Sequence, residues 1–406
     1  MRRFILLMAC FFLTSCASFG RGMVQGLLEN KSHQPPECLI WSSGFSGLAP
    51  LDTHTVKILL VHGIGNHTPG HSTAFMLALT QPLGMTQQDR SYKEIQLRDA
   101  QNQPVGVLRV YRFTNPETGK QMIFYEQTWS AITFPSKQLL SYDTNQEYSA
   151  RRALLNKEAK KYLNATLPDP LIYLGPDGQK MLDSSVQSFC WMTTYTYEAL
   201  PPRADDSCRI GAHAAMNSLR TDNFAFITSS LGSRIVIDAL QVVANQIGAS
   251  NGESQKALSL LRQKEIMIFM LANQLPLLQM GRTRPENQGQ ISAFCTPKGA
   301  LYNERMFQKL SVIAFSDPND LLSYALEPGA ADTYFDSKLC PEISNVSLTT
   351  TPTMDFGFGD FANPLSAHKN YIKNETVIKL IVNGLKKGYD SAELPAPCRW
   401  IELKGK

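Results

Sequence analysis

Short apolar runs recur along the chain and alternate with amphipathic stretches. The first run, Val56–Val61, is almost uninterrupted, which is typical of a strand buried on both faces of a parallel sheet. Similar runs follow beyond Asn223, at Phe224–Thr228, Glu265–Leu271, Leu310–Phe315 and Ile343–Leu348. Helical spacing covers Ser72–Leu83, Gly232–Gln246 and Tyr371–Leu385. This alternation predicts an α/β fold with a mostly parallel central sheet flanked by helices.

A different pattern lies between the first run and the later ones. Val105–Phe113 and Gln121–Trp129 alternate apolar and polar residues around the turn Asn115–Gly119, which predicts an antiparallel hairpin. Tyr148–Leu163 has helical spacing with interleaved basic residues. Such a stripe is more often a solvated helix face than a contact with lipid headgroups. We therefore expect one α/β domain over residues 55–390, with a cap-like insertion over about 130–222 and a C-terminal tail over 391–406.

The N-terminus has the layout of an export signal. Arg2 and Arg3 precede the apolar run Phe4–Leu13, which is too short to span a bilayer as a helix. The following Leu13-Thr14-Ser15-Cys16 resembles the box of bacterial lipoproteins, whose cysteine is lipidated and begins the mature chain. The resemblance implies a signal peptide over 1–15, a membrane anchor at Cys16 and a tether over 16–54. Ala17, where Asp would favour inner-membrane retention, favours the outer membrane of a bacterial envelope. An ordinary secretory signal is the alternative.

Composition narrows the class of protein. The 406 residues include 39 Lys and Arg against 35 Asp and Glu, a formal charge of +4. This balance lacks the basic excess of a nucleic-acid binder. Hydrophobic residues make up 43% of the chain, enough to bury a large core.

Whether the cysteines form disulfides depends on the compartment of the protein. With Cys10 removed and Cys16 lipidated, Cys38, Cys190, Cys208, Cys295, Cys340 and Cys398 remain. In an exported protein they predict up to three disulfides of undetermined connectivity. Cys190 with Cys208 and Cys295 with Cys340 are reasonable local pairs. Their spacing does not match a zinc site, so we expect no metal.

The segment Phe224–Arg234 reads as a strand, a serine-glycine turn and the start of a helix. Ser230 lies in the turn, with Thr228 two residues before it and Gly232 two residues after it. This arrangement resembles the nucleophile elbow of the α/β-hydrolase superfamily, of the serine esterase and lipase type. Thr228 replaces the usual first glycine. The resemblance implies an α/β-hydrolase fold with Ser230 as the nucleophile.

A second motif, His62-Gly63-Ile64-Gly65, directly follows the first predicted strand. In this superfamily a His-Gly pair at this place begins the loop that supplies one backbone N–H of the oxyanion hole, and the residue after the nucleophile supplies the other. By resemblance the two donors are Ile64 and Leu231. We expect the His62 imidazole to brace the loop and not to act as the base.

Chain order identifies the remaining members of a triad, which runs Ser, acid, His in this superfamily. Of the seven histidines, only His368 lies well after Ser230, in a predicted loop before the last helix. Asp317 and Asp320 both follow the strand Leu310–Phe315. The family pattern favours Asp320 as the acid, with Asp317 bracing the turn. Asp317 remains the alternative.

These resemblances imply a membrane-anchored serine hydrolase that cleaves carboxylic esters, lipid-like ones among them, through an acyl-enzyme and without a cofactor. Its partners would be an ester-containing small molecule or lipid and, through Cys16, the membrane; no nucleic acid is expected. The alternative is a catalytically silent envelope lipoprotein of the same fold that acts as a binding or assembly module.

Overall fold

The computed structural model describes residues 38–51, 54–88, 91–208, 215–248, 252–280, 282–355, 360–385 and 398–401. The predicted signal peptide, Cys16 and most of the predicted tether and tail lie outside these residues. Within the described ranges, no helix is both long enough and apolar enough to cross a bilayer.

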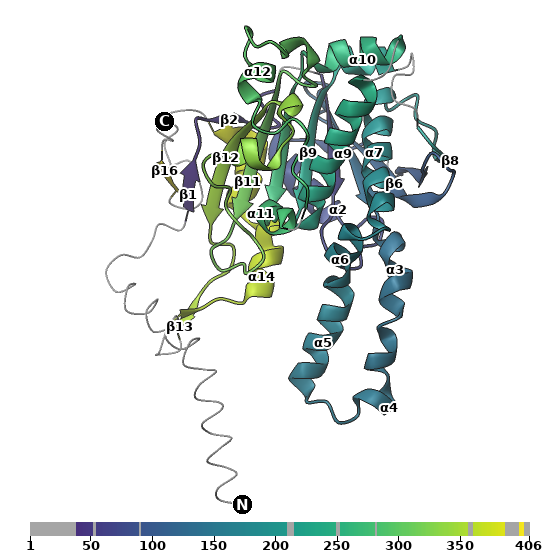
Figure 1. The fold of residues 1–406 in the computed structure, drawn as a ribbon, viewed down its shortest axis with the longest axis vertical. Helices are drawn as coiled ribbons and strands as arrows, with labels where there is room; N and C mark the ends of the chain where they lie inside the picture. The colour runs from purple at the N-terminus through teal and green to yellow at the C-terminus, as the bar shows by residue number, and fades with distance from the viewer. Residues whose placement is uncertain are drawn as a thin grey trace, which may run out of the picture.

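A large sheet of 12 strands forms the centre of the fold (Figure 1). Its strands are β1 (Cys38–Trp41), β3 (Thr55–Val61), β4 (Thr86–Gln87), β5 (Lys93–Arg98), β6 (Pro104–Thr114), β7 (Gln121–Thr128), β8 (Arg203–Asp206), β9 (Asn223–Ser229), β10 (Glu265–Leu271), β11 (Lys309–Ser316), β12 (Pro341–Leu348) and β16 (Cys398–Ile401). Neighbours in the order β12-β11-β10-β9-β3-β7 all run parallel. Next to them, β6 pairs antiparallel with β7, and β1 with β12. The predicted mostly parallel sheet is therefore confirmed.

Helices cover both faces of this sheet (Figure 1). The α-helices of the described chain are α2 (Thr73–Thr80), α3 (Ser130–Gln138), α4 (Gln146–Ser149), α5 (Leu154–Thr166), α6 (Pro168–Leu174), α7 (Gly178–Thr194), α8 (Ala215–Thr221), α9 (Leu231–Gly248), α10 (Glu253–Leu261), α11 (Leu275–Gln279), α12 (Ile291–Cys295), α13 (Ala330–Tyr334), α14 (Pro364–Lys369) and α15 (Glu375–Asn383). Side chains of β3 alternate between two cores. Leu59 and Val61 pack with α7, α9 and α10, whereas Ile58 and Leu60 pack with α2 and α15.

Two predicted helices have different bounds in the structure. The stretch Tyr148–Leu163 is broken between α4 and α5, where Ala153 takes an extended conformation and Arg152 pairs with Asp143 at 3.1 Å. The last helix begins only at Glu375, because Asn374 caps it, and it ends at Asn383, before Gly384, whose φ is 73°. The predicted hairpin is confirmed as β6 and β7.

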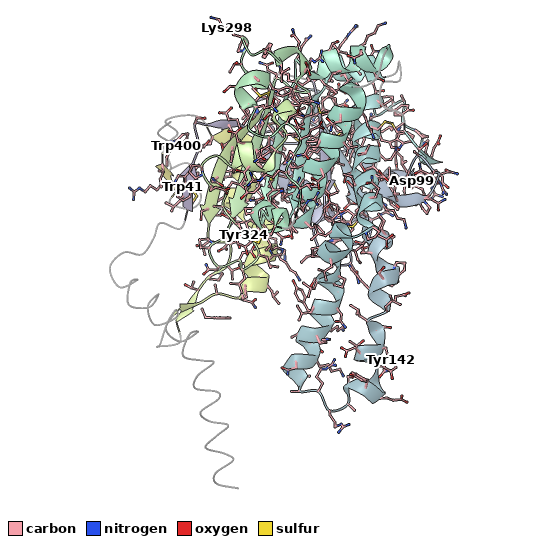
Figure 2. All side chains as sticks on the ribbon, viewed as in Figure 1. Trp41, Asp99, Tyr142, Lys298, Tyr324 and Trp400 are labelled. Atoms are coloured by element: carbon pink, nitrogen blue, oxygen red, sulfur yellow. A yellow bond between two sulfur atoms is a disulfide. The ribbon has the colours of Figure 1, made fainter. Side chains whose placement is uncertain are left out.

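The insertion contributes to two regions. Helices α3, α4, α5 and α6 form an arm that projects beyond the sheet, with Tyr142 at its far end (Figures 1 and 2). Helix α7 instead packs on the sheet, and β8 extends the sheet beside β5. The predicted tether and tail also contribute strands, since β1 lies in the former and β16 in the latter. The remaining short strands are β2 (Phe45–Ser46), β13 (Met354–Asp355), β14 (Asp360–Phe361) and β15 (Gly384–Leu385).

Three disulfides connect the six cysteines of the described chain. Cys190 is bonded to Cys208 and Cys295 to Cys340, as the two local pairings predict. The third joins Cys38 to Cys398, with a Cα–Cα distance of 4.4 Å. It links β1 to β16, which pair in parallel register at these two residues, and both cysteines are buried.

Removing this third disulfide should weaken the edge of the sheet. We expect Cys38→Ala/Cys398→Ala to lower the free energy of unfolding by about 2–4 kcal/mol, because the bond joins distant parts of the chain and constrains the unfolded state. Urea denaturation measures the change, and peptide mapping without reductant identifies the bond. Unchanged unfolding, or a different partner for Cys38, would contradict this assignment.

Candidate active site

Ser230 lies between the end of β9 and the start of α9. Its φ of 53° is left-handed, a conformation that is uncommon for residues other than glycine and that concentrates at functional sites. The Ser230 N–H donates to the carbonyl oxygen of Leu271 at 2.8 Å, which ties the turn to β10. Its Oγ is buried and has no hydrogen-bond partner among the described residues. The turn thus holds the Ser230 hydroxyl at the carboxyl edge of the parallel strands.

The turn is packed so closely that two neighbouring positions require glycine. A Cβ on Gly63 would lie 2.6 Å from Ser230 Cβ, and one on Gly232 would lie 2.7 Å from the His62 carbonyl oxygen. Thr228, by contrast, fits with its side chain: its hydroxyl lies 2.9 Å from Ser233 Oγ in a hydrogen bond. The turn therefore holds a threonine where the family pattern has a glycine.

His62 contacts the loop that follows β3. Its Nε2 accepts from the Trp129 N–H at 3.2 Å, so Nδ1 carries the proton and donates to the Gly63 carbonyl oxygen at 2.8 Å. That carbonyl belongs to the peptide whose N–H is Ile64. Burial lowers the pKa of His62 well below its ordinary value, which keeps the ring neutral. The imidazole therefore fixes the orientation of the Ile64 N–H.

The second expected donor of the oxyanion hole, the Leu231 N–H, belongs to the first turn of a helix. Leu231 is the first residue of α9, and N–H groups in the first turn of a helix have no intrahelical acceptor. The positive end of the helix dipole is also located there, which favours negative charge. The Leu231 N–H thus lies next to Ser230 in a position that favours an anion.

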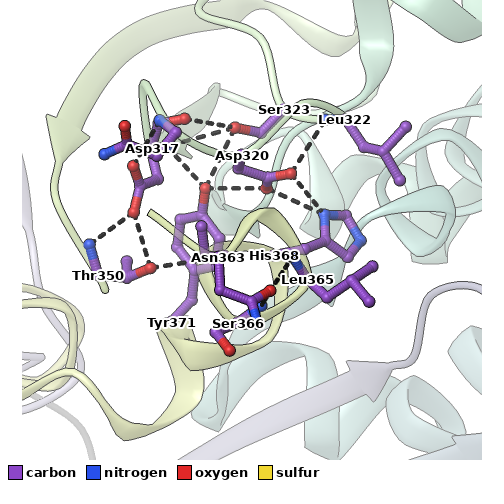
Figure 3. Close-up of polar contacts among 12 residues, drawn as sticks. Asp317, Asp320, Leu322, Ser323, Thr350, Asn363, Leu365, Ser366, His368 and Tyr371 are labelled. Atoms are coloured by element: carbon purple, nitrogen blue, oxygen red, sulfur yellow. Dashed lines mark hydrogen bonds and ion pairs between the residues drawn. The ribbon is translucent and has the colours of Figure 1, made fainter. Parts of the chain in front are cut away.

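His368 lies against Asp320 (Figure 3). Its Nδ1 is 3.0 Å from Asp320 Oδ1 and 2.9 Å from Oδ2. The carboxylate also accepts from the Leu322 N–H at 3.0 Å and from the Tyr371 hydroxyl at 3.2 Å. Asp320 and His368 are both buried. The predicted loop position of His368 is wrong: it lies in the last turn of α14, because Asn363 caps this helix and Pro364 occupies its first turn.

The Asp317 carboxylate does not meet His368 and has other partners (Figure 3). Its Oδ1 accepts from the Asn319 N–H at 2.8 Å, and its Oδ2 accepts from the N–H and the hydroxyl of Thr350 at 2.6 and 2.8 Å. Its own N–H donates to the Tyr371 oxygen at 2.7 Å. Asp317 thus braces the loop after β11, and Asp320 is the carboxylate that meets His368.

Sequence reasoning missed Tyr371 and Glu126. Burial raises the pKa of Tyr371, and the nearby Asp320 raises it further, so the hydroxyl keeps its proton. Glu126, which is fully buried in β7, accepts from the N–H groups of Gly70 and Ser72 at 2.6 and 2.7 Å. The signal for Glu126 was a carboxylate inside an apolar strand, whereas Tyr371 has no comparable signal.

Ser230, His368 and Ile64 line one cavity of about 550 Å³. Its apolar walls include Phe75, Ile227, Leu271 and Ile372. A cavity of this size is in the range that binds small molecules. The root of the arm also contributes to the lining, through Tyr162, Ala165 and Thr166.

Comparisons with protein-family models, with curated proteins and with solved structures each find no match to this chain. In the part of the chain that the structure describes, no group of three His, Cys, Asp or Glu side chains could hold a metal ion. The chemistry of the site is therefore inferred from its own geometry.

The histidines beside the cavity make stability depend on pH. Burial, and after it the charge of His71, lowers the pKa of His67 from 6.5 to about 4. Neutral His67 thus stabilises the fold fully above pH 6.5, and this contribution is lost as the pH falls from 6.5 to about 4. We expect urea denaturation to show a shallower decline over this range for His67→Gln than for wild type. Equal slopes would contradict the shift.

Proposed function

We propose that this protein is a serine hydrolase of the α/β-hydrolase superfamily that cleaves carboxylic esters. The proposal rests on one observation: Ser230 is held on a left-handed strand-to-helix turn, its hydroxyl has no hydrogen-bond partner among the described residues, and it shares a cavity with His368, whose Nδ1 contacts Asp320. These residues occur in the order Ser, Asp, His, as in that superfamily. The same proposal includes an anchor to the bacterial envelope through lipidated Cys16. In an envelope with two membranes, the anchor is in the outer membrane.

Sheet topology supports the superfamily assignment. The strand before Ser230, β9, lies between β3 and β10 and runs parallel to both. The loops that carry Ile64 and Asp320 follow β3 and β11, so they meet Ser230 at the carboxyl edge of one parallel sheet. In open α/β sheets this edge is where ligands bind.

The mechanism follows from the roles of these groups. Because His368 Nδ1 contacts Asp320, its Nε2 can act on Ser230. His368 Nε2 takes the Ser230 hydroxyl proton as the oxygen attacks the ester carbonyl. Asp320 holds the imidazole in the required tautomer and stabilises its cationic form. The N–H groups of Ile64 and Leu231 stabilise the oxyanion. His368 then returns the proton to the departing alcohol, and water hydrolyses the acyl-enzyme.

The cavity favours esters with an apolar acyl group. Phe75, Ile227 and Leu271 are among the residues that line it, and each CH₂ of a ligand that leaves water contributes about 0.8 kcal/mol. Lipid or lipid-like esters carry such an acyl group, and they occur in the envelope where we propose that the protein is anchored.

Substitution of the serine and the histidine tests the proposal. We expect Ser230→Ala and His368→Ala each to lower kcat for ester hydrolysis by about 10⁴-fold or more, and the double variant to lose little beyond that, because the two groups act as a unit. Ser259→Ala, exposed on α10, is the matched control and should retain wild-type kcat. A wild-type protein inactive on a panel of esters, thioesters and amides would instead favour the silent binding module.

The two aspartates should separate in their effects. Asp320→Asn should lower kcat by about 10⁴-fold, because the amide favours the wrong tautomer of His368. Asp317→Asn should act mainly on stability, lowering the free energy of unfolding by about 1–3 kcal/mol, since it weakens buried hydrogen bonds to a carboxylate. Kinetics and urea denaturation of both variants measure these effects. Near-wild-type kcat in Asp320→Asn would remove Asp320 from the triad.

A further inference from the structure

The root of the arm contains a buried ion pair. Lys137, in α3, places its Nζ 2.6 Å from Oδ1 and 2.8 Å from Oδ2 of Asp169, in α6. The side chains are 5% and 0% exposed. Because taking two charges out of water can cost more than their attraction returns, a pair like this is weak evidence for stability alone. Its hydrogen bonds to other groups are therefore informative.

Those hydrogen bonds go to the loop that carries Ile64. Asp169 Oδ2 accepts from the Gly65 N–H at 2.7 Å, and Lys137 Nζ donates to Asn66 Oδ1 at 3.0 Å. Ser130, at the start of α3, donates to the Gly65 carbonyl oxygen at 3.2 Å and accepts from the His67 N–H at 2.9 Å. The insertion thus binds the loop just after Ile64.

Two peptide planes flank Ile64, and each is held by a different group. The plane before it contains the Ile64 N–H and is held through the Gly63 carbonyl by His62. The plane after it contains the Gly65 N–H, which donates a hydrogen bond to Asp169. Gly65 has a φ of 111°, a region that other residues rarely adopt, so the chain can turn sharply beyond the held plane.

We propose that Asp169, held in place by Lys137, is a positioning residue that fixes the oxyanion loop through the Gly65 N–H and so aims the Ile64 N–H at the oxygen of the reacting ester. The inference rests on the proposed function. Asp169 does not line the cavity, so it acts through the backbone and not on the substrate. Burial raises the pKa of Asp169, while the Gly65 N–H and Lys137 oppose that rise.

A positioning role predicts a loss in kcat with little change in KM, because the oxyanion exists only along the reaction path. The test uses two double variants of the full chain, both of which remove the two buried charges. D169N/K137M keeps an amide oxygen that can accept from the Gly65 N–H, whereas D169A/K137M has no acceptor. The exposed pair Lys180–Asp177, whose side chains are 50% and 53% exposed, provides the control D177N/K180M.

We expect D169A/K137M to lose roughly 10²-fold in kcat with KM nearly unchanged, as for a misplacement of about 1 Å. D169N/K137M should recover most of the kcat, and the control should match wild type. A trifluoromethyl ketone, whose adduct places an oxyanion in the hole, should lose affinity for D169A/K137M in parallel with kcat/KM.

Wild-type kcat in folded D169A/K137M, or equal losses in both double variants, would overturn the inference while leaving the proposed hydrolase intact. If D169A/K137M does not fold, Asp169→Glu replaces it: this variant keeps the ion pair but moves the carboxylate by one methylene, and it should lower kcat at wild-type KM. Unchanged kcat in Asp169→Glu would likewise overturn the inference. A wild-type protein without hydrolase activity would overturn the proposed function and this inference together.

Discussion

The left-handed turn at Ser230 is the constraint on which the site depends. Such a backbone costs free energy in any residue with a side chain, and it persists here because its surroundings hold it on all sides. The Ser230 N–H donates to the carbonyl oxygen of Leu271 on β10. The packing around the turn leaves no room for a Cβ at positions 63 and 232, which are glycines. The central parallel strands therefore form the core and also hold at their carboxyl edge a serine hydroxyl that has no partner in the part of the chain that the structure describes.

Buried polar groups then orient what surrounds the serine, and each has a distinct task. Asp320 contacts His368, Asp317 braces its own loop, and the Tyr371 hydroxyl accepts from the Asp317 N–H and donates to the Asp320 carboxylate. His62 and Asp169 hold the two peptide planes that flank Ile64. Groups fixed in this way need no reorganisation when charge develops on a substrate, which is the physical basis of electrostatic catalysis.

Much of this arrangement could be predicted from local sequence. Continuous apolar runs predicted the parallel strands because residues buried on both faces leave no alternation. The choice between Asp317 and Asp320 depended on which side of one turn faces His368, and spacing does not contain that information. The helix around His368 had a readable signal in Asn363 and Pro364, a cap followed by proline. The ion pair of Lys137 and Asp169 had no readable sequence signal, because it forms only when two helices of the arm pack beside the same loop.

A crystal structure of the protein after reaction with a fluorophosphonate ester tests the role of Ser230 most directly. If Ser230 is an activated nucleophile, there is one covalent adduct, with phosphorus bonded to Ser230 Oγ, a phosphoryl oxygen within hydrogen-bond distance of the Ile64 and Leu231 N–H groups, and His368 Nε2 beside the adduct. A protein that takes up no phosphonate, or an adduct on another residue, would contradict this role of Ser230.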